Sequence, residues 1–176
     1  MTAVIAILCA AALVAVDQVT KALVVAHLGL GESVPLLENV LHFTYVRNDG
    51  AVFGSLSGKS YLFNTVTVVI VVAAIALIVL NKLGSKWLTA ATTLILAGGV
   101  GNLIDRFRLK YVIDFIDVRC FGRFWCWVFN FADCCVVVGC LMLLGYYLAD
   151  WIRESRSAKG KPLPTAETEE EPHDHA

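Results

Sequence analysis

Two aspartates, Asp114 and Asp133, occupy polar segments of an otherwise apolar chain. Asp114 lies in the segment 112–117 (VIDFID), and Asp133 ends the segment 129–133 (FNFAD). An ionisable group at membrane depth costs free energy, so such groups are usually retained for function. Two carboxylates that come together can share one proton, which supports acid–base attack by a water molecule. The two aspartates therefore predict a hydrolase that works at one face of a membrane.

The composition places the chain in a membrane. It has 176 residues, of which 58% are hydrophobic, and its mean hydropathy is +0.72. Soluble domains have about 45–50% apolar residues, so a water-soluble globule of this length could not bury the excess. The net charge of −1 does not bear on nucleic-acid binding, but no basic stripe is interleaved with aromatic residues, which excludes nucleic acid as a partner. We expect one domain made of a few helices.

Four stretches are long and apolar enough to cross a bilayer, which takes about 20 residues in a helix. The first stretch is interrupted by the charged residues Asp17 and Lys21 and then continues. The next two are uncharged over most of their length, and the only charged residue of the last is Asp133. The first has no basic leader and continues past the length of a short signal-peptide core, so we interpret it as a retained helix. We predict transmembrane helices at about 3–26, 61–81, 87–106 and 127–149.

Two long connections and a tail complete the chain. The connection 27–60 contains an alternating run rich in aromatic and β-branched residues, which is typical of a strand. We predict two short strands there, at about 34–37 and 41–46. The connection 107–126 is polar and aromatic, and we predict a loop. Residues 152–176 contain few apolar side chains and many charged ones, so we predict a disordered tail.

The unusual polar residues converge on one side of the predicted bundle. Four antiparallel spans place the end of the first, the start of the second, the end of the third and the start of the fourth together. The opposite side receives only a short turn and the two ends of the chain. The residues that map to the first side are Asp17, Lys21, Asn48, Asn102, Asp105, Arg106, Asp114, Asn130 and Asp133. This convergence predicts a single site.

Several of these residues also have structural interpretations. Asp17 and Lys21 have the i, i+4 spacing of a helical ion pair, and Lys21 could instead extend to the membrane interface. Asn130 and Asp133 share a helix face at i, i+3, and a lone carboxylate there would tend to be protonated. A structural role for Asp133 therefore remains an alternative, and we interpret Asp117 as a solvated loop acid or a helix cap.

A glycine-containing face lies near the end of the third span. Gly98, Gly101 and Asn102 are about one turn apart, as expected where membrane helices pack closely. Asp105 and Arg106 continue the Asn102 face and can neutralise each other. We therefore assign Asp105 and Arg106 a role in bracing the neighbouring loops rather than a catalytic role.

The six cysteines do not form a metal site. No Cys-x-x-Cys occurs, and no Cys/His cluster has the spacing of zinc ligands, so we predict no metal. Four of the six fall in apolar runs, where cysteine is usually a small core residue. Cys120 and Cys126 lie in the polar 107–126 connection, where they could form a disulfide in an oxidising compartment or remain free thiols.

Five motifs carry a resemblance to a known family. They are residues 17–21 (DQVTK), 48–53 (NDGAVF), 101–106 (GNLIDR), 112–115 (VIDF) and 129–133 (FNFAD). In this order, and with four spans, the chain resembles the bacterial prolipoprotein signal peptidases, also called signal peptidase II. The resemblance extends over nearly the whole chain, to about residue 150.

The resemblance implies a fold and an activity. The fold would be an all-α membrane protein of four transmembrane helices, with a small extracytoplasmic β-sheet, or cradle, and a flap loop. The activity would be that of an aspartyl endopeptidase of the bacterial cytoplasmic (inner) membrane, acting as a monomer without a cofactor. Its substrates would be diacylglyceryl-modified prolipoproteins, which it cuts just before the lipidated cysteine.

The resemblance also implies residue roles and a topology. The catalytic pair carries over to Asp114 and Asp133. Both termini would be cytoplasmic, with the connections 27–60 and 107–126 outside, whereas the positive-inside rule hardly helps because basic residues occur on both sides. The residues expected to bind substrate or support the site are Asp17, Lys21, Asn48, Gly98, Asn102, Asp105, Arg106 and Asn130.

Two departures and one alternative accompany this interpretation. Trp127 and Val128 stand where a proline often precedes the last motif, and Cys134 stands where serine is frequent, but neither change removes a catalytic group. The alternative is a small proton- or ion-coupled transporter in which the buried acids and Lys21 relay protons. A transporter should have polar residues through the full depth of the bundle, whereas here they gather at one side.

Overall fold

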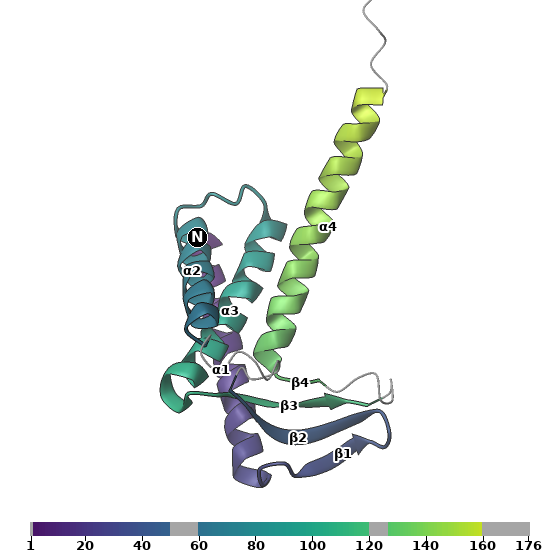
Figure 1. Cartoon of the computed structure of the whole chain (residues 1–176). Helices are drawn as coiled ribbons and strands as arrows, with labels where there is room; N and C mark the ends of the chain where they lie inside the picture. Colours follow the sequence, from purple (N-terminus) through teal and green to yellow (C-terminus); the bar gives the residue numbers. More distant parts are fainter. Residues whose placement is uncertain (1, 50–59, 120–126, 160–176) are drawn as a thin grey trace, which may run out of the picture.

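The computed structural model describes residues 2–49, 60–119 and 127–159, and within these the chain forms four helices and one small sheet (Figure 1). Three of the helices are long and apolar enough to cross a membrane, and the fourth has a shorter apolar stretch, Asn64–Val79. This mostly helical membrane fold with a small sheet is the predicted class. The helices are α1 (Thr2–His27), α2 (Ser60–Val79), α3 (Lys86–Leu109) and α4 (Phe131–Lys159).

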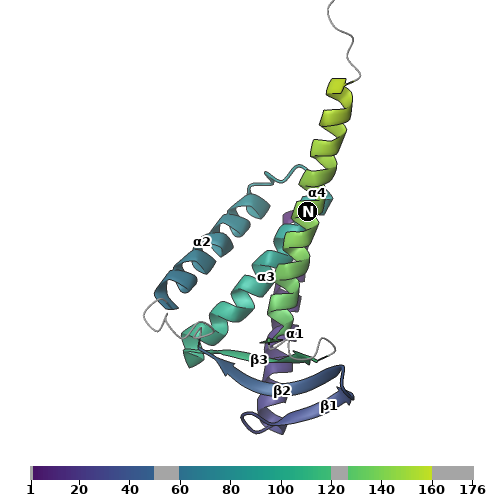
Figure 2. The same ribbon diagram turned by 45° about the vertical axis from the view of Figure 1, so that its right-hand side comes forward.

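Helix α3 is the centre of the bundle and contacts the other three helices (Figure 2). Of the 18 residues that form the most apolar part of α3, 61% are buried, against 17% in the corresponding parts of α1 and α4. Helices α1 and α4 therefore turn most of their apolar side chains outward, as expected where lipid and not water is the solvent. The bundle can present such a surface only inside a membrane.

Glycines allow α3 and α4 to approach closely. A Cβ added to Gly98 of α3 would lie 2.2 Å from the carbonyl oxygen of Ala132, and one added to Gly139 of α4 would lie 2.8 Å from that of Ala91. Small residues at such positions are characteristic of helix contacts in membranes. The predicted packing role of Gly98 is confirmed, and its contact lies at the first turn of α4.

The sheet lies across one end of the bundle, and both ends of the described chain lie toward the other (Figure 1). Its order is β1-β2-β3-β4, with every neighbouring pair antiparallel. The two strands predicted near 34–37 and 41–46 are confirmed. The strands are β1 (Ser33–Leu37), β2 (Leu41–Asn48), β3 (Val112–Val118) and β4 (Val128–Phe129).

Strand β3 corrects the prediction of a loop over 107–126. Helix α3 ends at Leu109, and Lys110 in the left-handed conformation (φ 72°) turns the chain into β3. The strand was missed because aspartates interrupt its apolar sequence, VIDFIDV, which then lacks the simple alternation of a half-buried strand. Its first four residues are all buried, since one face contacts α1 and the other contains the site.

The sheet is attached to the end of α1 through an apolar cluster. Val24 of α1 packs with Tyr45 of β2 and with Ile113 and Phe115 of β3. The rings of Phe43 and Phe115 meet edge to face with centroids 5.9 Å apart. This cluster fixes β3 against the end of the bundle and so determines where Asp114 can lie.

The fourth helix begins later and ends later than the predicted span 127–149. Residues Val128–Phe129 pair with β3, and the helix starts only at Phe131. It then continues to Lys159, into the segment predicted to be a disordered tail. The extension, residues 152–159, contains arginine, glutamate, alanine and lysine, which favour helix. It contains no glycine or proline.

Candidate active site

Asp133 lies in the first turn of α4, where Asn130 caps the helix. The side-chain oxygen of Asn130 accepts a hydrogen bond from the backbone N–H of Asp133 (2.9 Å), and Asp133 Oδ2 accepts one from the backbone N–H of Asn130 (3.2 Å). This reciprocal arrangement is a capping box, which satisfies backbone donors at a helix start. The i, i+3 spacing recognised in the sequence is therefore a cap, and it holds Asp133 at the sheet end of the bundle.

Asp114 reaches the same place from β3. Its Oδ1 accepts a hydrogen bond from Asn130 Nδ2 (2.6 Å), and its Oδ2 accepts one from Asn48 Nδ2 (2.9 Å). Only 2% of Asp114 is exposed. Burial raises the pKa of its carboxyl to about 6, and the nearby negative charge of Asp133 also acts to raise it. Asp114 therefore takes up a proton far more readily than an ordinary aspartate.

Two asparagine side chains connect the two carboxylates. Asn130 Nδ2 donates to Asp114 Oδ1 and also to Asn102 Oδ1 (3.1 Å). Asn102 Nδ2 in turn donates to Asp133 Oδ1 (2.7 Å). Each of the four carboxylate oxygens thus accepts a hydrogen bond from an N–H group. The structure brings together the predicted residues Asn48, Asn102, Asp114, Asn130 and Asp133.

Lys21 lies next to Asn102 and is almost fully buried. Its Nζ forms ion pairs with Asp17 (2.9 Å) and Asp105 (2.8 Å), and it donates a third bond to Asn102 Oδ1 (3.2 Å). All three donors of the ammonium group are used, so Lys21 is a fixed internal cation. The predicted Asp17–Lys21 ion pair is confirmed, and the alternative of a lysine extending to the interface is wrong.

Asp17 and Asp105 fasten this cation to the elements that contain the catalytic candidates. Asp17 Oδ1 accepts a hydrogen bond from the N–H of Ala132 in the first turn of α4 (2.9 Å). Asp105 Oδ2 accepts one from the N–H of Ile113, next to Asp114 (3.2 Å). The carboxylates of α1 and α3 therefore position the backbone beside each member of the candidate pair.

Sequence reasoning missed Gln18, although it lies in the same motif as Asp17 and Lys21. Its Nε2 lies 3.1 Å from Asp17 Oδ2, 3.0 Å from Asp105 Oδ1 and 3.2 Å from the Gly101 carbonyl oxygen. The position between an acid and a lysine on one helix was the available signal. Gln18 was missed because its amide is uncharged. It nevertheless contacts both Asp17 and Asp105, which together with Lys21 form the ion cluster.

Two predicted roles need correction. Asp105 pairs with Lys21 and not with its neighbour Arg106, which has no ion pair to any residue in the described ranges. The reason is that Asp105 points into the bundle toward α1, whereas Arg106 is only partly buried. Asp117 is neither a loop acid nor a helix cap, since it lies on β3 and bonds Thr44 (2.7 Å) and Arg119 (2.5 Å).

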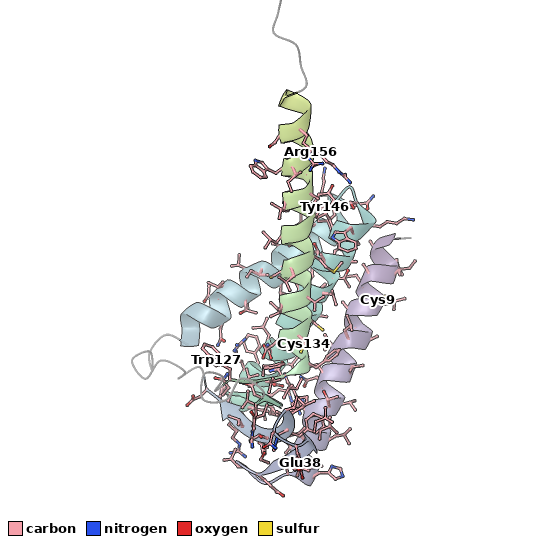
Figure 3. All side chains as sticks on the ribbon, turned by 90° about the vertical axis from the view of Figure 1, so that its right-hand side faces the viewer. Cys9, Glu38, Trp127, Cys134, Tyr146 and Arg156 are labelled. Atoms are coloured by element: carbon pink, nitrogen blue, oxygen red, sulfur yellow. The ribbon has the colours of Figure 1, made fainter. Side chains whose placement is uncertain are left out.

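The described residues contain no group of three or more histidine, cysteine, aspartate or glutamate side chains arranged to hold a metal ion. Every buried side-chain nitrogen and oxygen among them has a hydrogen-bond partner. The cysteines with described positions are free, and Cys134 lies beside the sheet end of α4 (Figure 3). The predicted pairing of Cys120 with Cys126 falls outside the described residues.

The fold and the site together define a multi-pass membrane enzyme with a pair of acids, one buried and one partly buried, at one end of its bundle. The family described as signal peptidase (SPase) II matches residues 9–149. With most of its length matched, the chain belongs to the signal peptidase II family. The removal of signal peptides from lipoprotein precursors is therefore its activity, and the transporter alternative gains no support.

Individual relatives agree with this assignment. The lipoprotein signal peptidase of Halothermothrix orenii is 43% identical over 130 residues, which cover 74% of this chain and 86% of that protein. That of Geobacillus thermodenitrificans is 43% identical over 141 residues, covering 80% and 88%. A solved structure described as a bacterial membrane enzyme superposes with a TM-score of 0.75 at 34% identity, covering 82% of this chain and 93% of its own.

Proposed function

We propose that the chain is an aspartyl endopeptidase in which Asp114 and Asp133 are the catalytic residues. The observation that carries the proposal is the convergence of these two carboxylates, from a strand and a helix, on Asn130, whose side chain donates to Asp114 and whose backbone N–H donates to Asp133. Neither carboxylate forms an ion pair with a described residue, in contrast to Asp17 and Asp105. Two adjacent acids without a counter-ion cannot both ionise cheaply, so they share a proton.

The mechanism follows from that shared proton. The ionised aspartate accepts a proton from a water molecule, whose oxygen attacks the carbonyl carbon of the peptide bond. The protonated aspartate donates its proton to the carbonyl oxygen, which gives a tetrahedral intermediate. When the C–N bond breaks, a proton from the first aspartate passes to the leaving nitrogen. The second aspartate takes a proton from one hydroxyl of the intermediate, which becomes the new carbonyl, so the pair again holds one proton. The amides of Asn48, Asn102 and Asn130 keep both carboxylates in place.

The substrate we propose is a prolipoprotein whose cysteine already carries a diacylglyceryl group. Such a group does not leave the bilayer, so the peptide bond before it lies at the membrane surface. The candidate pair lies on β3 and in the first turn of α4, and Figure 1 shows these two elements meeting at the sheet end of the bundle. Exposed apolar residues there include Phe107 (61%) and Trp127 (53%), which suit the interface between lipid and water.

The proposed orientation in the bacterial inner membrane has the sheet outside and both termini in the cytoplasm. Arg156 and Tyr146 lie toward the end of α4 away from the sheet (Figure 3). The enzyme is proposed to act as a monomer. Cysteine labelling tests the topology, because an outside reagent should label position 32 and not position 160. The reverse pattern would overturn it.

The activity is tested with purified protein and two precursors that differ only in the diacylglyceryl group. We expect cleavage before the modified cysteine and little cleavage of the unmodified twin. The Asp114→Asn and Asp133→Asn variants, matched in size, serve as controls for the carboxylates. Equal cleavage of both precursors would reject the proposed substrate, and full activity of either variant would reject the proposed pair.

A further inference from the structure

We propose that Lys21 is a positioning residue whose charge acts through the Asn102 side chain to keep Asp133 ionised, so that the shared proton resides on Asp114. The inference rests on the proposed function, since it assigns the base and the acid within that pair. Lys21 does not contact either carboxylate. It contacts Asn102, and Asn102 contacts Asp133.

The first step is the orientation of the Asn102 amide. An ammonium group has three donors and no acceptor, so the Asn102 atom that faces Lys21 Nζ must be the oxygen. The NH₂ group of Asn102 then faces Asp133 Oδ1, to which it donates at 2.7 Å. Lys21, together with Asn130 Nδ2, which donates to the same oxygen, therefore ensures that Asp133 meets a donor. A carboxylate that accepts such a bond is favoured in its charged form.

The second step is the position of Asp133 on α4. It lies in the first turn, and its Oδ2 accepts the backbone N–H of Asn130. The start of a helix carries a partial positive charge, which also favours a carboxylate. Two N–H donors and a helix start therefore act on the same side chain in the same direction.

The third step is the contrast with Asp114. Asp114 lies on a strand, where there is no such helix start, and it is 2% exposed. Its two hydrogen bonds come from neutral amides, those of Asn48 and Asn130. Burial in such a setting favours the neutral acid, in agreement with a pKa raised to about 6. When one proton is shared between the two, the surroundings place it on Asp114.

The charged groups of the helices beside the pair come from α1 and α3, whereas α2 and β4 contain none. In the sheet, Arg47 of β2 bonds Tyr45 and lies over the Tyr111 ring, and Asp117 of β3 pairs with Arg119. Helix α1 contributes Asp17 and Lys21, which form one ion pair. Helix α3 contributes Asp105, paired with Lys21, and the partly buried Arg106, whose positive charge acts on both Asp114 and Asp133. Arg106 therefore does not distinguish the two acids. The charge of Lys21 also acts to lower the pKa of Asp114, but the NH₂ group of Asn102 donates to Asp133 and not to Asp114.

A purely structural role for Lys21 is the competing explanation, because it also clamps Asp17 to Asp105. The two roles differ in their effect on the pH profile of cleavage. The test uses three proteins that all contain Asp105→Asn, which avoids leaving Asp105 as a buried unpaired charge. They have Lys21, Lys21→Arg or Lys21→Met, and each is assayed for kcat against pH with the lipidated precursor.

We expect Lys21→Met to lower kcat at least tenfold and to move the acid limb of the profile upward by about one pH unit, because Asp133 then ionises less readily. Lys21→Arg retains the charge and should restore the position of the limb. An unchanged limb in the Lys21→Met protein, or an equal shift in the Lys21→Arg protein, would overturn the proposal and leave Lys21 a clamp.

Infrared spectroscopy locates the proton without a Lys21 variant and so covers the case in which Lys21→Met does not fold. At a pH just below about 6, the carboxylic acid band of the wild type should disappear in Asp114→Asn and persist in Asp133→Asn. The opposite pattern would overturn the assignment. Absence of cleavage by the wild type would instead reject the proposed function, which distinguishes the two failures.

Discussion

Two pairs of aspartates lie at the same end of this molecule, three of them buried and Asp133 partly buried, and the two pairs are held in different ways. Asp17 and Asp105 both form ion pairs with Lys21 at less than 3 Å. Asp114 and Asp133 accept hydrogen bonds only from amides and backbone N–H groups in the part of the chain that the structure describes. Charges that are compensated stay fixed and hold elements together, whereas uncompensated neighbouring acids can exchange a proton. Burial alone does not mark the proposed catalytic residues, because both pairs include nearly fully buried members.

The largest expected effect comes from removing either member of the uncompensated pair. Asp114→Asn and Asp133→Asn each keep the size of the side chain but remove the base or the acid. We expect cleavage of the lipidated precursor to fall about 10²–10⁴-fold in each, with the protein still folded and inserted. Asp105→Asn, in the compensated pair, is the matched control and should lose less. Near-normal turnover of Asp114→Asn together with an inactive, folded Asp105→Asn would reassign the pair to Asp105 and Asp133.

The second prediction concerns the compensated pair and is an effect on stability. Lys21→Met leaves Asp17 and Asp105 buried without their cation, which should cost about 3–5 kcal/mol of unfolding free energy. The double variant Lys21→Met/Asp17→Asn removes one of these charges and should recover part of the loss. Both are measured by unfolding in mixed detergent micelles with increasing denaturing detergent. If the single and double variants were equally stable, the ion cluster would not be a structural unit.

The third prediction uses the titration of Asp114, whose pKa is raised by burial from 3.8 to about 6. A raised pKa means that the folded protein binds this proton more tightly than the unfolded chain. The resulting stability is fully present below pH 3.8 and is lost as the pH rises through about 6. If Asp114 is the acid, cleavage should fall about tenfold for each pH unit above this value. Unfolding measured across this range should show the pH-dependent loss in the wild type and not in Asp114→Asn.

Most of the site could be predicted from the sequence because its residues are related by short helical spacings and by the order of the spans. Helical spacing connected Asp17 with Lys21 and Asn130 with Asp133, and antiparallel spans brought the polar residues to one side. The family resemblance then selected Asp114 and Asp133 from the five aspartates in these segments. Spacing cannot show which distant charges pair, so Asp105 was assigned to its neighbour Arg106 and not to Lys21.

The parts that sequence could not give depend on tertiary contacts. Strand β3 forms because β2 and β4 pair with it and α1 covers one of its faces, and none of these partners is close in sequence. Gln18 was missed because its value lies in the two carboxylates that it joins across α1 and α3. The ends of α4 were misplaced because a short strand precedes the helix and because its charged extension has high helix propensity.

The smallest expected effect concerns Gly98 of α3, which packs against the first turn of α4. This helix contact lies between the two pairs of aspartates. A methyl group added there would lie 2.2 Å from the Ala132 carbonyl oxygen and 2.7 Å from Val136 Cγ2, so α4 must shift. The shift would move Ala132, whose N–H binds Asp17, together with the cap that holds Asp133.

We expect Gly98→Ala to cost about 1–3 kcal/mol of stability and to lower cleavage several-fold, because the acids no longer meet correctly. Gly145→Ala is the matched control: Gly145 lies in α4, where nothing is within 4 Å of the added carbon, and alanine favours helix. Thermal unfolding and cleavage of both variants check this. If the two variants had equal stability and equal cleavage activity, the close approach of α3 to α4 would not be needed to align the ion cluster with the proposed catalytic pair.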